Sequence, residues 1–86
     1  MKNKYYYWID TEFLYGDSTP KFALYRGEYE DGKKNRETEE VILWEAYEDV
    51  DGVAEAVKDG DINLGWDLID EYIKDKLGFL PDYEIN

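Results

Sequence analysis

The fold is decided by residues 22–47, which read FALYRGEYEDGKKNRETEEVILWEAY. Alternating residues of the first part, with Phe22 and Leu24 on one side, predict a strand over residues 22–29. Asp31-Gly32 follows, and this dipeptide favours a turn because Gly accepts a positive φ without steric cost. The stretch therefore predicts a hairpin with a polar loop.

The returning strand of this hairpin is predicted over residues 39–47. Its centre, Val41-Ile42-Leu43-Trp44, is apolar on both faces, which is typical of a strand covered by helices on one side and partly screened on the other. Upstream, residues 5–15 are mostly aromatic, β-branched or apolar, and turn residues follow at 16–20. They predict another strand, so that three consecutive strands form an antiparallel meander.

Downstream of the hairpin, the apolar residues recur with the period of a helix. A short helix is predicted from apolar residues at i, i+3, i+4 and i+7, which are Val50, Val53, Ala54 and Val57. Asp49 or Asp51 is its predicted N-terminal cap, and Gly60 is its predicted end. A longer helix is predicted over residues 63–77, with Gly78 as its stop and one apolar stripe formed by Ile62, Trp66, Ile69, Ile73 and Leu77. We therefore expect one α+β domain over residues 1–86, of order βββαα, with both helices packed on one face of the sheet.

Composition excludes many kinds of functional site. The 86 residues include no Cys and no His, which removes disulfides, His/Cys zinc sites, thiol nucleophiles and imidazole bases. Ser18 is the single Ser, and no His is present to activate it. We expect no cofactor, no bound metal and no enzymatic activity.

The sequence also bears on location. No apolar run approaches the roughly 18 residues of a membrane helix. Residues 1–5 lack the apolar core of a signal peptide. We expect a cytoplasmic protein that does not bind membranes.

Charge is unevenly distributed along the chain. Of the net charge of −12, residues 1–36 contribute six acids and seven bases, whereas residues 37–86 contribute sixteen acids and three bases. This balance disfavours direct binding of nucleic acid, whose phosphates would be repelled, and it favours a basic partner.

The predicted long helix carries an acidic stripe formed by Asp67, Asp70, Glu71 and Asp75. Like charges at i, i+4 destabilise a helix by about 0.2 to 0.5 kcal/mol per pair, so something other than stability favours them. At helical spacing these carboxylates lie about 5 to 6 Å apart and imitate the row of phosphates along a nucleic-acid strand. We predict that they bind a partner together with acids of the preceding region, at Glu45, Glu48, Asp49, Asp51 and Glu55. The alternative is an ordinary solvated surface whose charge helps solubility.

In size, absence of Cys, acidic surplus and aromatic content, the chain resembles small acidic inhibitor proteins that phages and plasmids use against host nucleic-acid enzymes. They include anti-restriction proteins, anti-CRISPR proteins and uracil-DNA glycosylase inhibitors. The resemblance is one of composition over the whole chain. It implies a non-enzymatic inhibitor that mimics nucleic acid and blocks a basic nucleic-acid-binding protein or a nuclease complex.

Aromatic residues support a different function. Tyr5, Tyr6, Tyr7 and Trp8 alternate across the two faces of the first strand, with one face in the core and the other free for a partner or for self-association. The chain would then be a small adaptor domain that works through exposed aromatics. A homodimer is a possible form.

Two short motifs point to metal chemistry. Ile9-Asp10-Thr11-Glu12-Phe13 resembles the first motif of the DEDD exonucleases, but that family needs two further acidic motifs and a larger fold. Residues 59–70 resemble an EF-hand or dockerin calcium loop, except that Leu64 replaces the turn Gly and Asp70 replaces the usual Glu. The same residues are explained by a helix end at Gly60 and a new helix capped by Asp61 or Asn63.

Overall fold

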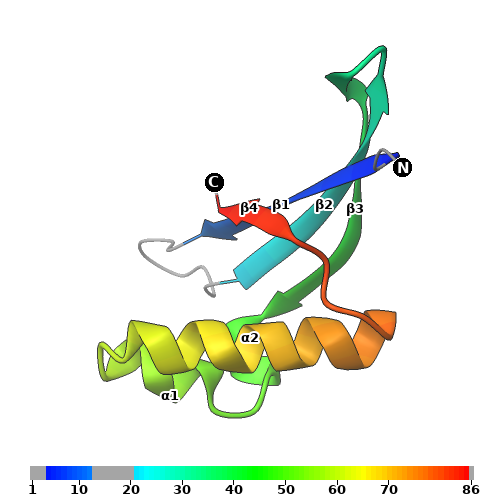
Figure 1. Cartoon of the computed structure of the whole chain (residues 1–86). Coiled ribbons are helices and arrows are strands. Elements are labelled where there is room, and N and C mark those ends of the chain that lie inside the picture. Colours follow the sequence, from blue (N-terminus) through cyan, green and yellow to red (C-terminus); the bar gives the residue numbers. More distant parts are fainter. Residues whose placement is uncertain (1–3, 13–20, 86) are drawn as a thin grey trace.

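The computed structural model describes residues 4–12 and 21–85, with the side chain of Glu12 excepted. It contains a four-stranded sheet and two α-helices, so the predicted α+β class is confirmed. The helices lie together on one side of the sheet (Figure 1). None of the helices in these described ranges is long and apolar enough to cross a membrane.

The sheet differs from the predicted three-stranded meander. Strands β1 (Tyr5–Glu12), β2 (Lys21–Glu30) and β3 (Lys33–Ala46) pair antiparallel in sequence order. A fourth strand, β4 (Tyr83–Ile85), pairs parallel with β1, which gives the order β3-β2-β1-β4. The meander prediction was therefore incomplete, because the C-terminal strand returns to the sheet after both helices. The first strand was predicted over residues 5–15, and β1 confirms it as far as Glu12. Its predicted continuation to Tyr15 and the turn predicted at 16–20 lie outside the described residues.

The predicted hairpin turn is confirmed. Asp31 and Gly32 both have positive φ, 52° and 78°, as a tight two-residue turn between right-handed twisted strands requires. The returning strand starts at Lys33, earlier than the predicted residue 39, because its polar residues continue the ladder opposite Glu28–Glu30.

A bend interrupts this hairpin near its middle. Arg26 pairs with Glu40 and Glu28 pairs with Asn35. Between these two pairs, β3 contains residues 36–39, whereas β2 contains only Gly27. An irregularity of this kind increases local twist and bends the strands. The tip of the hairpin accordingly turns away from the helices (Figure 1).

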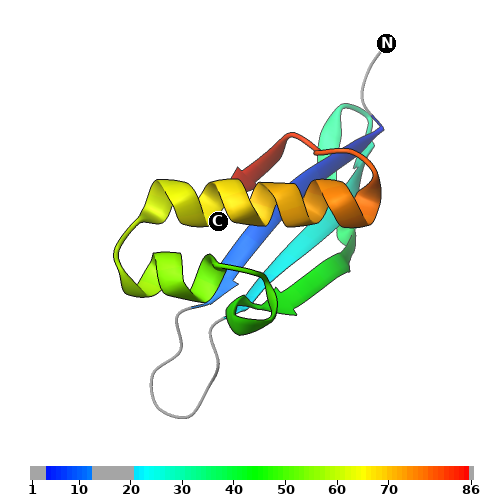
Figure 2. The ribbon, with the colours of Figure 1, turned by 90° about the horizontal axis from the view of Figure 1, so that it is seen from below.

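The helical layer follows directly after β3. A short 3₁₀-helix, η1 (Tyr47–Asp49), leads to α1 (Val53–Lys58) and α2 (Ile62–Leu77). The predicted N-caps of α1, Asp49 or Asp51, were wrong, because its N-cap is Gly52 and no side chain caps it. The cap of α2 is Asp61, whose Oδ1 accepts a hydrogen bond from the Leu64 N–H. Viewed from below, α2 crosses the sheet diagonally and α1 lies beside its N-terminal half (Figure 2).

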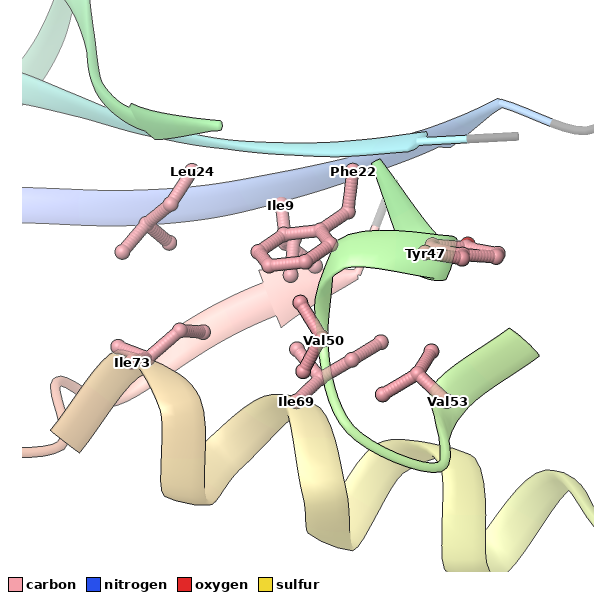
Figure 3. Packing of buried hydrophobic residues seen from close by; sticks show 8 residues of the cluster. All are labelled: Ile9, Phe22, Leu24, Tyr47, Val50, Val53, Ile69 and Ile73. Carbon is pink, nitrogen blue, oxygen red and sulfur yellow. The ribbon is translucent and has the colours of Figure 1, made fainter. Parts of the chain in front are cut away.

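The core lies between the sheet and the helical layer (Figure 3). Its buried side chains come from β1, β2, η1, the residue after η1, α1 and α2, and are Ile9, Phe22, Leu24, Tyr47, Val50, Val53, Ile69 and Ile73. The predicted apolar stripe of α2 is correct at Ile69 and Ile73, which are 3% and 0% exposed. It was wrong at Ile62, which is 65% exposed. Ile62 is the first residue of α2, and this end of the helix lies beyond the edge of the core.

Candidate functional site

The acids of the helical layer form the most highly charged surface of the described chain. Residues 47–77 carry ten acids and three bases, a net charge of −7. The acids are mostly exposed. The ion pairs between described residues join Arg26 to Glu40, Lys34 to Glu84 and Arg36 to Glu39, and all of them belong to the strands. The carboxylates of the helical layer are therefore left without neutralising partners within the described chain.

Three acids of α2 remain together on its outer surface. Asp67, Glu71 and Asp75 are exposed and follow one another at intervals of one helical turn. Asp70, predicted to share this stripe, lies apart from it. Asp70 is half-buried, and its Oδ1 accepts a hydrogen bond from the Tyr83 hydroxyl.

Asp70 therefore fixes β4 against α2. Burial, and then the hydrogen bond to Asp70, raise the pKa of the Tyr83 hydroxyl. The Tyr83 ring also packs against Trp66, with 6.3 Å between the ring centroids. Asp70 thus faces β4, whereas Asp67, Glu71 and Asp75 face solvent.

A shallow groove of about 280 Å³ brings acids of separate elements together. It runs between the segment joining η1 to α1 and the middle of α2. Carboxylates lie around an apolar and aromatic floor, and the lining residues are Asp49, Val50, Asp51, Leu68, Glu71 and Tyr72. Three of the predicted partner-binding acids thus meet in one place.

Tyr72 connects this groove to the end of β3. Its hydroxyl donates a hydrogen bond to Glu45 Oε2, at 2.9 Å. Burial, the bond to Glu45 and the charges of Asp49 and Asp75 raise the pKa of the Tyr72 hydroxyl. Glu45 is half-buried, so the structure places it at the inner margin of the acidic surface.

The remaining predicted acids and bases are distributed around the groove. Glu48 and Glu55 are exposed on η1 and α1, and neither lines it. The bases of the layer are Lys58, Lys74 and Lys76. Lys76 Nζ lies 5.4 Å from the centre of the Tyr72 ring, so the C-terminal end of α2 is less acidic than its middle.

The opposite face of the sheet, which none of the described helices covers, is aromatic. Trp8 and Tyr25 stack on it, with ring centroids 4.0 Å apart and planes 2° from parallel. Trp44 is 60% exposed there. We name this surface the open face, defined by Tyr6, Trp8, Asp10, Lys21, Ala23, Tyr25, Val41, Trp44 and Glu84. The sequence indicated its Tyr6 and Trp8 side but missed Trp44, although a strand that is apolar on both faces was the available signal.

The described residues show no metal site at either metal motif, and the Glu12 side chain and Phe13 of the first motif lie outside them. Among the described residues, no group of three or more Asp or Glu side chains lies close enough to hold a metal ion. The residues that resemble a calcium loop are helical from Ile62 onward, so they cannot wrap around an ion as such a loop does. Asp10 lines a pocket on the open face, away from the acids of the helical layer.

The comparisons with known proteins add no relative: no family model, curated protein or solved structure matches this chain. The function must therefore be argued from the surfaces themselves.

Proposed function

We propose that the chain is a non-enzymatic inhibitor that binds a basic nucleic-acid-binding protein or nuclease complex through the helical layer, in place of nucleic acid. One observation carries the proposal. The acids of η1, α1 and α2, apart from the half-buried Asp70, are exposed and lack ion-pair partners among the described residues, whereas Arg26, Lys34 and Arg36 of the sheet are paired with acids.

The outer surface of α2 supplies the regular part of the mimic. Asp67, Glu71 and Asp75 repeat about every 6 Å along the helix axis, from four residues at about 1.5 Å each. Their mutual repulsion is not relieved by a nearby ion pair among the described residues. A groove lined by Lys and Arg would relieve it, and that relief contributes to affinity.

The groove beside α2 extends the mimic sideways. Asp49 and Asp51 approach Glu71 across an apolar floor that includes Leu68 and Tyr72. Long basic side chains bury their methylenes on apolar surface while their charged ends bind carboxylates. The groove therefore suits Lys or Arg side chains of the same partner.

The test compares two variants of equal charge. The first replaces Asp67, Glu71 and Asp75 with Asn, Gln and Asn on α2. The second replaces Asp31, Glu37 and Asp82, which are exposed outside the helical layer, with Asn, Gln and Asn. Each removes three negative charges, so the pair separates local charge from net charge.

The wild-type protein, immobilised, is used to capture proteins from a bacterial lysate with and without competitor DNA. We expect it to retain basic nucleic-acid-binding proteins that DNA displaces. The α2 variant should lose the capture and the second variant should keep it. Raising salt from about 50 to about 500 mM should weaken capture, because it shortens the screening length. Equal capture by both variants at both salt concentrations would refute mimicry through α2.

The adaptor function is a distinguishable outcome of the same experiment. Trp44 lies on the open face, on the other side of the sheet from the core and the helices. Under our proposal, Trp44→Ala leaves capture unchanged. Loss of a salt-insensitive capture in Trp44→Ala, with the α2 variant unaffected, would instead assign partner binding to the aromatics.

A further inference from the structure

A pocket of about 350 Å³ hollows the open face at the end farther from the hairpin tip. Tyr25 and Ala23 line it from β2, and Val41 and Trp44 line it from β3. Val41 and Trp44 are 44% and 60% exposed. A pocket bordered by a protruding indole therefore lies on the part of the open face that the hairpin tip does not line.

Among the described side chains, the charges in and around the open face are balanced, unlike those of the helical layer. The pocket itself has one acid and one base, Asp10 and Lys21. Toward the hairpin, Lys34 pairs with Glu84 at 3.0 Å and Arg36 pairs with Glu39 at 2.8 Å. A surface with paired charges can be buried at lower electrostatic cost than one with unpaired carboxylates.

This balance decides which partner the open face accepts. The chain carries a net charge of −12, so two copies repel each other wherever their helical layers approach. Contact through the open faces places the acidic layers on the two outer sides of the pair.

Shape supports the same partner. Trp44 both borders the pocket and protrudes beside it, so one surface offers a knob and a hole. Under two-fold symmetry, each knob enters the hole of the other copy and every favourable contact is made twice. Trp44 would become buried in such a contact, and large buried aromatic side chains dominate the binding energy of interfaces.

We propose that two copies of this chain associate through their open faces, with each Trp44 indole seated in the pocket of the other copy. This dimer does not depend on the proposed inhibitory function, because it uses the opposite side of the sheet. It leaves Asp67, Glu71 and Asp75 of both copies accessible.

Sedimentation equilibrium on the full chain tests the dimer, over protein concentrations from about 1 to about 500 µM, which covers typical weak to moderate affinities. The mass should rise from 10.2 kDa toward twice that value. Higher salt should strengthen dimerisation because it screens repulsion between acidic copies. That salt dependence is opposite to the one expected for capture of a basic partner.

Two variants and one control locate the interface. Trp44→Ala and Val41→Glu alter exposed side chains, so both should fold, and each should raise the dissociation constant more than about 10-fold. The control, Ile62→Ala, removes an exposed side chain from the helical layer and should leave the constant unchanged. A monomer throughout the concentration range, or a dimer that Ile62→Ala weakens and Trp44→Ala does not, would overturn the proposal.

Discussion

Lys34 and Glu84 belong to the two opposite edge strands of the sheet, yet Lys34 Nζ lies 3.0 Å from Glu84 Oε2. Two strands separate them, and strands are spaced about 4.8 Å apart, so a flat sheet would hold their backbones roughly 14 Å apart. The contact therefore requires the hairpin to fold over the open face. The bend opposite Gly27 provides this movement, and Tyr6 fills its inner side.

The first prediction concerns Gly27 at this bend. A Cβ there would lie 2.3 Å from Tyr6 Cζ, so Gly27→Ala displaces a buried ring whose hydroxyl donates to Glu39 Oε2 at 2.6 Å. We expect unfolding free energy to fall by about 1 to 3 kcal/mol, as for other overpacked sites. Urea denaturation measures the change.

A matched substitution controls for the effect of the residue type. Gly65 lies inside α2, where an added Cβ would meet Val57 Cγ2 at an ordinary 3.8 Å. Gly65→Ala should therefore stabilise the fold by about 0.5 to 1 kcal/mol. Equal effects of the two substitutions would mean that Tyr6 does not pack tightly at the bend.

The second prediction concerns alkaline pH. Burial, followed by the hydrogen bond to Glu39, raises the pKa of Tyr6 to about 12. The folded state thus holds this proton more tightly than the unfolded chain, whose tyrosines titrate near pH 10. The contribution is complete below pH 10 and is lost as pH rises toward 12.

Urea denaturation at about pH 8 and about pH 11 measures this loss, since the two values bracket the ordinary tyrosine pKa. Tyr6→Phe is less stable at the lower pH because it lacks the bond to Glu39, but its stability should fall less between the two pH values. The raised pKa values of Tyr47, Tyr72 and Tyr83 leave some alkaline loss in the variant. An undiminished fall would assign the whole effect to those other hydroxyls.

The third prediction compares two isoleucines of α2. Ile69 is 3% exposed in the core, whereas Ile62 is 65% exposed at the start of the helix. Ile69→Ala should cost about 2 to 5 kcal/mol. Ile62→Ala should stay within about 0.5 kcal/mol of wild type. Thermal unfolding measures both effects. Similar losses in the two variants would mean that the assigned core face of α2 is wrong.

The fourth prediction separates a helix cap from a calcium ligand at Asp61. Its Oδ1 accepts the Leu64 N–H, so Asp61→Ala should cost about 0.5 to 2 kcal/mol, whereas Asp61→Asn, another good cap, should cost little. Millimolar calcium should leave the melting temperature nearly unchanged. A calcium-dependent rise that EDTA reverses and Asp59→Ala abolishes would instead support a calcium site.

Local sequence patterns predicted the features of the fold that depend on interactions between residues close together in the chain. The period of Ile69 and Ile73 revealed the core face of α2, and Asp31-Gly32 revealed the hairpin turn. Both depend on neighbouring residues and on the stereochemistry of one element. The sequence signal at β4 was weaker, because its three residues hold their place through pairing with β1, at the other end of the chain.

The acidic site shows the same limit. The spacing of Asp67, Glu71 and Asp75 was enough to place them on one helix surface. Helical spacing could not show that Asp70 is held by Tyr83, since that contact depends on where β4 returns. Nor could it show that Asp49 and Asp51 meet Glu71, which requires the path of the chain from η1 into α1.

The irregular pairing of β3 also bears on aggregation. This 14-residue strand occupies an edge of the sheet, and long exposed edges recruit strands from other molecules. Its register shifts twice, between Leu24 and Tyr25 and between Arg26 and Glu28 of its partner strand, so the edge is broken into shorter, differently twisted runs. A foreign strand that paired with one run would lose alignment with the next. We therefore expect the bend to oppose the open-ended stacking of strands that produces amyloid fibrils.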